Sequence, residues 1–257
     1  MLESLSILGV KVNKITSKDI LDKIEDFLVS NKQNYIVTLN SEIVLKAQKD
    51  EEYLHILNNA DLSITDGIGL KFAGLASGNN LEKITGADLT EKILKIAENK
   101  KLKIAVLNWS RGLSKKEDIE KALTKKYPDL EFIVENIERM QDSLESFAER
   151  LQRNGSSKLL QKFKPAILFI TLGAPDQEKF IYHNLSKIPS IKLALGVGGS
   201  FDFISGKIKR APLIFQKLGI EWFWRLAMQP RRWRKIYKAV IIFPCEFIKW
   251  KFVNRFL

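Results

Sequence analysis

Polar and glycine-rich segments follow the short apolar runs of this chain, and they hold the residues whose types suit chemistry. They are Thr38-Leu39-Asn40, Asp66-Gly67-Ile68-Gly69, Asn108-Trp109-Ser110-Arg111-Gly112, Gly173-Ala174-Pro175-Asp176-Gln177-Glu178 and Gly196-Val197-Gly198-Gly199-Ser200-Phe201-Asp202-Phe203. Glycines let backbone N–H groups approach a phosphate, so Gly196, Gly198 and Gly199 are candidates for contacts to a nucleotide. A helix that begins at Pro175 or Gln177 offers its positive end to an anion. Each segment alone is also compatible with an ordinary turn.

Several familiar kinds of site are absent from the sequence. The glycines at 196–199 do not complete the G-x-G-x-x-G fingerprint, no Walker motif is present, and no Asp-x-Asp pair occurs that would hold a metal on a sugar diphosphate. The only histidines, His55 and His183, lie in charged helical segments, so we expect both at the surface and no zinc site. The sequence therefore predicts neither a metal nor a cofactor. Any catalysis must rest on carboxylates, amides, backbone dipoles and cations.

The elements that position these segments alternate along the first 206 residues. The expected strands are Tyr35–Leu39, Leu62–Thr65, Lys103–Leu107, Leu130–Val134, Ala166–Thr171 and Lys192–Val197, and the expected helices are Ser17–Ser30, Ser41–Lys49, Asp88–Lys100, Lys115–Lys126, Asp142–Arg153 and Gln177–Lys187. This alternation predicts a Rossmann-like α/β fold, a parallel sheet with helices on both faces. In such sheets the ligand lies outside the carboxyl ends of the strands, so the polar segments should meet along one edge.

The last 51 residues differ from the rest in charge and in aromatic content. Residues 207–257 carry thirteen Lys and Arg against Glu221 and Glu246, a formal charge of +11 out of +12 for the whole chain, and four of the five Trp. Cationic side chains are drawn to anionic lipid headgroups, and indole rings settle among those headgroups. The composition therefore predicts an element that lies on a membrane surface.

An amphipathic helix is the structure that this tail favours. Its apolar residues recur three and four positions apart, with basic residues largely between them: Trp233, Ile236, Tyr237, Val240, Ile241, Pro244, Phe247 and Ile248 against Arg231, Arg234, Lys235 and Lys238. Pro244 is expected to kink the helix or divide it. The charge-free run Ala239–Cys245 is far shorter than the roughly 20 residues that span a bilayer. One alternative is packing on the protein's own core; another is a nucleic-acid patch, which the one-sided clustering argues against, so no nucleic acid is expected.

Composition sets the remaining bounds. A chain of 257 residues, 45% hydrophobic and 28% charged, can form one domain of about 200 residues with an appendage, and we place these at residues 1–206 and 207–257. Met1–Lys14 shows no secretory signal, and the single cysteine, Cys245, fits a reducing compartment. We therefore expect a cytoplasmic protein, peripheral on the inner face of the cell membrane, and leave a homo-oligomer open.

Six linked motifs occur in order between about Leu8 and about Lys235. They are Thr38-Leu39-Asn40, Ala60-Asp61-Leu62 with Asp66-Gly67-Ile68-Gly69, Thr85-Gly86-Ala87-Asp88-Leu89, the segments at 173–178 and 196–203, and Glu221-Trp222-Phe223-Trp224-Arg225-Leu226. This series resembles the WecG/TagA/CpsF family of glycosyltransferases. The resemblance implies metal-independent, inverting transfer of a sugar from a UDP donor to a polyprenyl-diphosphate-linked sugar. TagA-like members transfer N-acetylmannosamine to the 4-hydroxyl of GlcNAc on undecaprenyl diphosphate, in wall teichoic acid assembly.

The resemblance also implies roles for single residues. An inverting transfer needs a base that takes the proton of the acceptor hydroxyl, and the family's assignment falls on Asp66. The alternative for Asp66 is a turn or N-cap residue before Gly67. The other implied roles are polar contacts to sugar or acceptor for Thr38, Asn40 and Gln177, and contacts to phosphates, in place of a metal, for Arg225 and Arg232.

Two departures from the family pattern concern the same edge. Relatives usually have Arg where this chain has Lys83, which we retain as a substrate contact although lysine lacks the bidentate fork of arginine. Relatives usually show a glycine-rich loop at residues 108–112, so nucleotide contacts there are not carried over; Trp109 is either a stack for uracil or a lid over the core. The alternatives for function are the same fold with a glucosyl or N-acetylmannosaminuronic acid donor, or a non-catalytic module that binds membranes or nucleic acid.

Overall fold

A six-stranded parallel sheet forms the centre of the protein, whose computed structural model describes residues 2–139, 156–217, 220–230 and 233–253. The strands are β3 (Asn34–Leu39), β4 (Leu62–Thr65), β5 (Ile104–Trp109), β6 (Phe132–Ile137), β7 (Ile167–Ile170) and β8 (Leu193–Gly196). Their order across the sheet is β4-β3-β8-β7-β5-β6, and each neighbouring pair is parallel. Each strand overlaps one expected from the sequence, so the predicted parallel sheet is confirmed.

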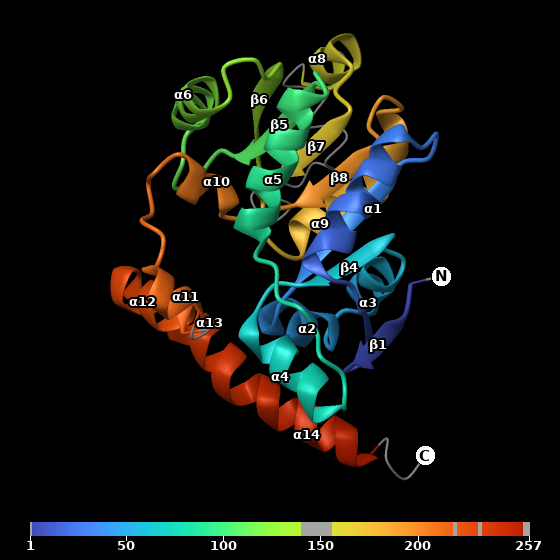
Figure 1. Cartoon of the computed structure of the whole chain (residues 1–257), viewed down its shortest axis with the longest axis vertical. Helices are drawn as coiled ribbons and strands as arrows, with labels where there is room; N and C mark the ends of the chain where they lie inside the picture. Colours follow the sequence, from blue (N-terminus) through green and yellow to red (C-terminus); the bar gives the residue numbers. More distant parts are fainter. Residues whose placement is uncertain (1, 140–155, 218–219, 231–232, 254–257) are drawn as a thin grey trace.

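Helices cover both faces of the sheet (Figure 1). The first face carries α2 (Ser41–Ala47), α3 (Glu51–Asn58), α8 (Ser156–Phe163) and α9 (Asp176–Asn184), and the second carries α1 (Ser17–Val29), α5 (Gly86–Asn99), α6 (Lys116–Lys126) and α10 (Ser200–Ile204). Side chains of a strand point alternately to the two faces, and in β3 both sets are buried. Tyr35, Val37 and Leu39 join the first core, whereas Ile36 joins the second. Burial on both sides fixes this register.

Some elements differ from those expected. A hairpin of β1 (Ser4–Ile7) and β2 (Val10–Asn13) precedes the sheet, and its turn residues Leu8 and Gly9 have φ of +52° and +75°. Ile7, Val10 and Val12 from this hairpin are fully buried in the first core. The helices α3 and α4 (Ile68–Ala76) were not expected either. The predicted helix at 142–153 lies outside the described residues.

The C-terminal appendage is a series of helices: α11 (Leu213–Lys217), α12 (Glu221–Met228), α13 (Trp233–Tyr237), a π-helical segment (Lys238–Ile242) and α14 (Phe243–Val253). The chain stays helical from 233 to 253, so the predicted division at Pro244 is not seen. Proline has no N–H to donate to the preceding turn. The π-helical segment, which ends at Ile242 two residues before Pro244, is the kind of local rearrangement that accommodates such a residue.

Two opposite faces of α14 meet different surroundings. Phe243 and Phe247 are buried in the first core and stack on each other, and Trp250 packs beside them. Ile248 and Phe252 are instead more than half exposed. Packing on the protein's own core therefore accounts for one face of the helix only. Among the described helices, none is both long and apolar enough to cross a bilayer.

Candidate active site

Four adjacent strands carry the polar segments to one edge of the sheet. β4, β3, β8 and β7 are neighbours in that order, and all four are parallel. Their carboxyl ends therefore lead into the segments that begin near Asp66, Asn40, Val197 and Thr171. Ligands of open α/β sheets bind outside this edge, so the topology alone makes it the candidate site.

Thr38, Asp66 and Ser200 converge on Gly86. A Cβ placed on Gly86 would lie 3.3 Å from Asp66 Oδ2 and 3.6 Å from both Thr38 Oγ1 and Ser200 Oγ. Gly86 is the first residue of α5, and Asp66 follows β4 with its backbone N–H bonded to the carbonyl of Leu39 at 2.7 Å. The N-cap residue of α4 is Gly67, so Asp66 does not serve as that cap. Its carboxylate is available for another role at this edge.

Burial gives the Asp66 carboxyl an unusual proton affinity. It raises the pKa of Asp66 from its ordinary 3.8 to about 6, although the backbone N–H of Gly86 and the positive charges of Arg225 and Lys83 oppose the rise. A carboxylate with a pKa near 6 is largely ionised at neutral pH, and it binds a proton more tightly than a solvated aspartate does. Both properties suit a general base.

The appendage brings a cation to this carboxylate. Arg225 lies on α12 with its guanidinium carbon 4.9 Å from the centroid of the Phe203 ring. A Cβ on Gly199 would lie 3.6 Å from Arg225 Nη2. Lys83 belongs to the same region, because its backbone pairs with Thr65 at the end of β4 and its Nζ lies 3.9 Å from Glu221 Oε2 on α12. Arg232 lies outside the described residues.

Two of the implied substrate contacts already make bonds within the protein. Asn40 caps α2, and its Oδ1 accepts from the backbone N–H of Ile43 at 3.1 Å. Gln177 is buried, and its Oε1 accepts from the backbone N–H groups of Gly173 and Gly198 at 3.0 Å each. Gln177 thus joins the loop after β7 to the loop after β8. Direct contacts of either side chain with a substrate stay predictions.

The glycines after β8 are required by close packing and by backbone conformation. A Cβ on Gly196 would lie 2.5 Å from Gln177 Nε2, and Gly198 has φ of +48°. Any larger residue at 196 would push Gln177 away, and L-residues rarely adopt the conformation of Gly198. The loop therefore depends on the Gln177 side chain for its shape. Its contact with a nucleotide stays a prediction.

Trp109, the last residue of β5, packs against other side chains of the protein. The guanidinium carbon of Arg139 lies 3.6 Å from the centroid of the Trp109 ring, and the ring packs against the first core. Asn108 is buried and donates to the carbonyl of Ser114, while it accepts from Thr171 Oγ1. These contacts favour the alternative in which Trp109 covers the core.

The contacts between residues 1–206 and the appendage could not be predicted from the sequence. Thr85 caps α5 by accepting from the backbone N–H of Asp88 at 3.1 Å. Arg210, which precedes the appendage helices, pairs with Asp88 Oδ1 at 2.6 Å and donates to Thr85 Oγ1 at 3.2 Å. The Thr-x-x-Asp spacing signals a capped helix, but the partner Arg210 is 122 residues away in the chain and leaves no local signal.

The two histidines are the side chains that a zinc site would use first. His55 and His183 lie at the surface as expected, and His183 Nε2 is 2.8 Å from Glu52 Oε1. Among the described residues, no group of three or more His, Cys, Asp and Glu side chains is placed to hold a metal ion.

A carboxylate of raised pKa, with cations beside it at the carboxyl edge of a Rossmann-like sheet, fits an enzyme that transfers a group from a nucleotide donor. The chain belongs to the WecG/TagA/CpsF family of glycosyl transferases, whose family model matches residues 5–256. The resemblance found in the motifs is therefore confirmed, and the protein is a glycosyltransferase.

Three similar proteins bear the name N-acetylglucosaminyldiphosphoundecaprenol N-acetyl-beta-D-mannosaminyltransferase. The protein of Staphylococcus aureus (strain MRSA252) is 31% identical over 252 residues, which cover 96% of this chain and 93% of the relative. That of Bacillus spizizenii is 33% identical over 211 residues, 82% of this chain and 77% of the relative. That of Bacillus subtilis (strain 168) is 30% identical over 218 residues, which cover 84% of this chain and 80% of the relative.

Proposed function

We propose that this protein transfers N-acetylmannosamine from UDP-ManNAc to GlcNAc linked to undecaprenyl diphosphate, forming the β-1,4 bond of the wall teichoic acid linkage unit. The names of the relatives supply the sugar and the acceptor. The observation that carries the proposal is the Asp66 carboxylate, which has a raised pKa and lies where a ligand of this fold binds.

Asp66 acts as the general base in the proposed reaction. It accepts the proton of the acceptor 4-hydroxyl while that oxygen attacks the anomeric carbon of the donor sugar. The bond from the anomeric carbon to the UDP oxygen breaks, and UDP leaves with the electron pair. Attack opposite to the leaving group inverts the configuration, so an α-linked donor gives a β-linked product.

Protein groups stabilise the charge of the departing UDP. Arg225 supplies a guanidinium beside Gly199, and Lys83 supplies an ammonium near Asp66. The backbone dipoles of the loop at 196–199 add to this without reorganisation during the reaction; two of its N–H groups, those of Val197 and Gly198, already donate to Ile170 and Gln177 within the protein. These groups take the part that a divalent ion plays in many sugar-nucleotide enzymes.

Transfer is therefore expected to survive removal of divalent metals. With excess EDTA, turnover measured by UDP release should stay within about twofold of the untreated rate, because cations and backbone dipoles bear the charge of the leaving group. Strict dependence on added Mg²⁺ or Mn²⁺ would contradict this expectation.

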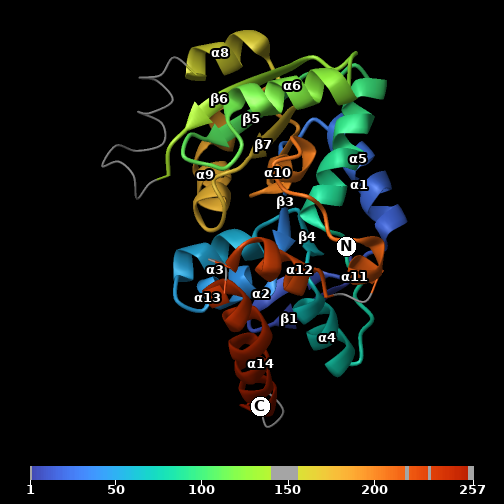
Figure 2. The same cartoon turned by 90° about the vertical axis from the view of Figure 1, so that its left-hand side faces the viewer.

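The appendage is proposed to dock the enzyme peripherally on the inner, anionic face of the cell membrane. Lys251 of α14 donates to the carbonyl of Ala76 at the end of α4, and the two helices lie side by side in both views (Figures 1 and 2). Exposed apolar side chains gather on them and on α13: Phe72 and Leu75 from α4, and Trp233, Tyr237, Ile248 and Phe252 from the appendage. Such rings among basic residues suit the headgroup region.

Neutralising lipid-facing cations should weaken docking without touching the chemistry. Lys235 pairs with Glu42 of α2 at 3.1 Å, so the test uses the exposed Arg234, Lys238 and Lys249, each changed to Ser. Lys249 pairs within its own helix, with Glu246 at 3.2 Å. Each cation contributes about 1 kcal/mol at an anionic surface, so the triple variant should bind anionic vesicles about a hundredfold more weakly and with less dependence on salt. Turnover on a water-soluble acceptor analogue should persist.

A matched control removes the same charge elsewhere. Lys95 on α5 and Lys121 and Lys125 on α6 are exposed, and α6 lies at the opposite end of the molecule from α14 (Figure 1). Their triple Ser variant should bind vesicles almost as the unchanged chain does. Equal loss of binding in the two triples would mean that net charge, and not the appendage, governs docking.

A donor screen with a lipid-linked GlcNAc acceptor tests the proposed reaction itself. Product mass distinguishes N-acetylmannosamine from glucose and from N-acetylmannosaminuronic acid. A product that contains only one of the other sugars would overturn the proposed donor and leave the mechanism standing. No product with any donor, together with tight binding of vesicles or oligonucleotides, would favour a non-catalytic module.

A further inference from the structure

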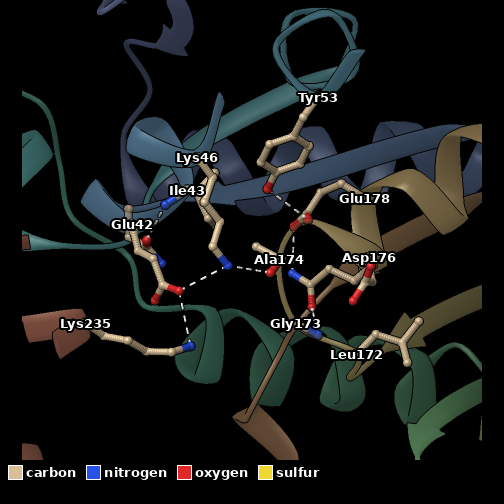
Figure 3. A network of polar contacts seen from close by, with 12 residues as sticks. Glu42, Ile43, Lys46, Tyr53, Leu172, Gly173, Ala174, Asp176, Glu178 and Lys235 are labelled. Atoms are coloured by element: carbon tan, nitrogen blue, oxygen red, sulfur yellow. Dashed lines mark hydrogen bonds and ion pairs between the residues drawn. The ribbon is translucent and has the colours of Figure 1, made fainter. Parts of the chain in front are cut away.

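Glu178 is a second buried carboxyl at this end of the sheet, and the proposed reaction does not use it. It lies in the first turn of α9 and is only 1% exposed. Its Oε1 accepts from Gln177 Nε2 at 2.6 Å, and its Oε2 accepts from the hydroxyl of Tyr53 on α3 at 3.0 Å (Figure 3). Tyr53 is fully buried, so the carboxyl sits between two fixed donors.

The other end of the Gln177 amide holds two loops together. Its Oε1 accepts from the N–H groups of Gly173 and Gly198, and the side chain fills the space in which a Cβ of Gly196 would lie. The loop after β7 has a further support, because Lys46 Nζ donates to the carbonyl of Ala174 at 2.6 Å. The conformation of the loop after β8 thus depends on the orientation of the Gln177 side chain.

The Glu178 carboxylate and the backbone N–H groups of Gly173 and Gly198 favour the same orientation of this amide. An amide has a donor end and an acceptor end, and a half-turn about its last bond exchanges them. Ionised Glu178 only accepts, so it selects the orientation in which Nε2 faces it and Oε1 faces the two backbone N–H groups. The reversed orientation would set the Gln177 N–H groups against the N–H groups of Gly173 and Gly198, which leaves buried donors without acceptors.

We propose that Glu178 is a positioning residue: it fixes the orientation of the Gln177 amide, and through it the backbone of the loop at 196–199 that receives the phosphates of the donor. The second half of this statement rests on the proposed function, which assigns the loop to UDP. The first half concerns the protein alone and can be tested without any ligand.

Burial raises the pKa of Glu178 from 4.5 to about 7, while hydrogen bonds from Gln177 and Tyr53 and the charge of Lys46 oppose the rise. Burial also raises the pKa of Tyr53 well above its usual value, so its hydroxyl keeps the proton that it donates. Measurements at pH 8 therefore have Glu178 mostly ionised and Tyr53 neutral.

Two substitutions at 178 and one control test the proposal. Glu178→Gln keeps the size but removes the carboxylate that favours one orientation of Gln177, and Glu178→Leu removes both acceptors. Asn184→Leu is the control, because Asn184 is buried on the same helix and donates to the carbonyl of Phe180, away from both loops. The readouts at pH 8 are the hydrogen exchange of the Gly173 and Gly198 amides and the affinity for UDP measured by calorimetry.

We expect the exchange of both amides to accelerate about tenfold in Glu178→Gln and further in Glu178→Leu, with UDP affinity weaker by about threefold and tenfold. Asn184→Leu should leave both readouts unchanged, even where its melting temperature falls. Unaltered exchange at Gly173 and Gly198 in Glu178→Gln would overturn the proposal. So would equal changes in the Asn184→Leu control. If exchange accelerates in the Glu178 variants but the unsubstituted protein itself does not bind UDP, the assignment of the loop to UDP is refuted and the role of Glu178 stands.

Discussion

Replacing Asp66 by asparagine is expected to lower turnover by about 10²–10⁴, the contribution typical of a positioned general base. Asparagine has almost the same size as aspartate and can still accept from the backbone N–H of Gly86, but it cannot take the proton of the acceptor hydroxyl. Affinity for UDP should change little. The measurement is kcat from UDP release with a soluble acceptor analogue, together with calorimetric binding of UDP. Near-normal turnover in this variant would remove Asp66 from the mechanism.

The pH dependence gives an independent check on the same residue. Because the base must be unprotonated, kcat/KM should rise with pH through a single ionisation near pH 6 and level off above it, following the pKa of Asp66. Any residual activity of Asp66→Asn should lack this rising limb. A limb that persists unchanged in the variant would assign the ionisation to another group.

Stability distinguishes a lost base from a lost fold. The folded-state pKa of Asp66, about 6, lies above its ordinary 3.8, so ionisation of this carboxyl destabilises the native state as pH rises between these values. Asparagine carries no charge and escapes that cost. The variant should therefore melt no lower than the unchanged chain at pH 7.5, and a clear fall in melting temperature would point to misfolding as the cause of low activity.

Changing Arg225 to glutamine is expected to lower turnover by about 10²–10³, on the water-soluble analogue as well as on lipid-linked acceptor. In the proposed mechanism its charge meets the negative charge that develops on the leaving diphosphate, so the loss should fall on the transition state. Arg225→Lys should recover part of the rate, because lysine keeps the charge and loses the planar fork. The free energy of binding to anionic vesicles should change by no more than the contribution of one cation, about 1 kcal/mol.

A control separates the charge of Arg225 from the placement of the appendage. Arg210→Gln removes the ion pair with Asp88 and the hydrogen bond to Thr85 that tie the appendage to α5, and it leaves the side chains of Asp66, Lys83 and Arg225 in place. We expect this variant to lose less turnover than Arg225→Gln. A chain that ends after Ser205 gives the limiting case: full activity on the soluble analogue would show that the appendage anchors the enzyme and contributes nothing to the chemistry.

The sheet and the edge that carries the candidate site follow from the sequence, because the strands are short, largely apolar runs and polar residues follow them. The hairpin at residues 4–13 was not expected, although the alternation of polar and apolar residues in Ser4–Ile7 and Val10–Asn13, on either side of Leu8-Gly9, is a hairpin signal. Helix α4 is hard to recognise because Gly69 and Gly74 interrupt it, and exposed Phe72 and Leu75 give it no polar face. Its sequence carries little of the period that marks a surface helix.

Roles that depend on partners far along the chain stay hidden in the sequence. Gln177 reads as a polar residue at a helix start, yet its acceptor oxygen meets the N–H of Gly198, 21 residues later. Glu178 and Tyr53 are 125 residues apart, and nothing local marks either as buried. The appendage shows a related limit, because a period of three to four residues identifies an apolar face but cannot tell whether lipid or the protein's own core covers it.

The confinement of charge to the appendage makes the whole molecule an electric dipole. Residues 207–257 carry +11 and the other 206 residues together only +1, and α14 lies along one end of the molecule (Figure 1). The field of an anionic bilayer reaches about 8 Å into physiological salt, so it exerts a torque on the protein before any contact is made. For the docking proposed above, we therefore expect the molecule to arrive with α14 and α4 foremost, so that a larger share of its collisions with the membrane leads to docking. Salt should therefore slow association by disordering the approach, in addition to weakening the complex once formed.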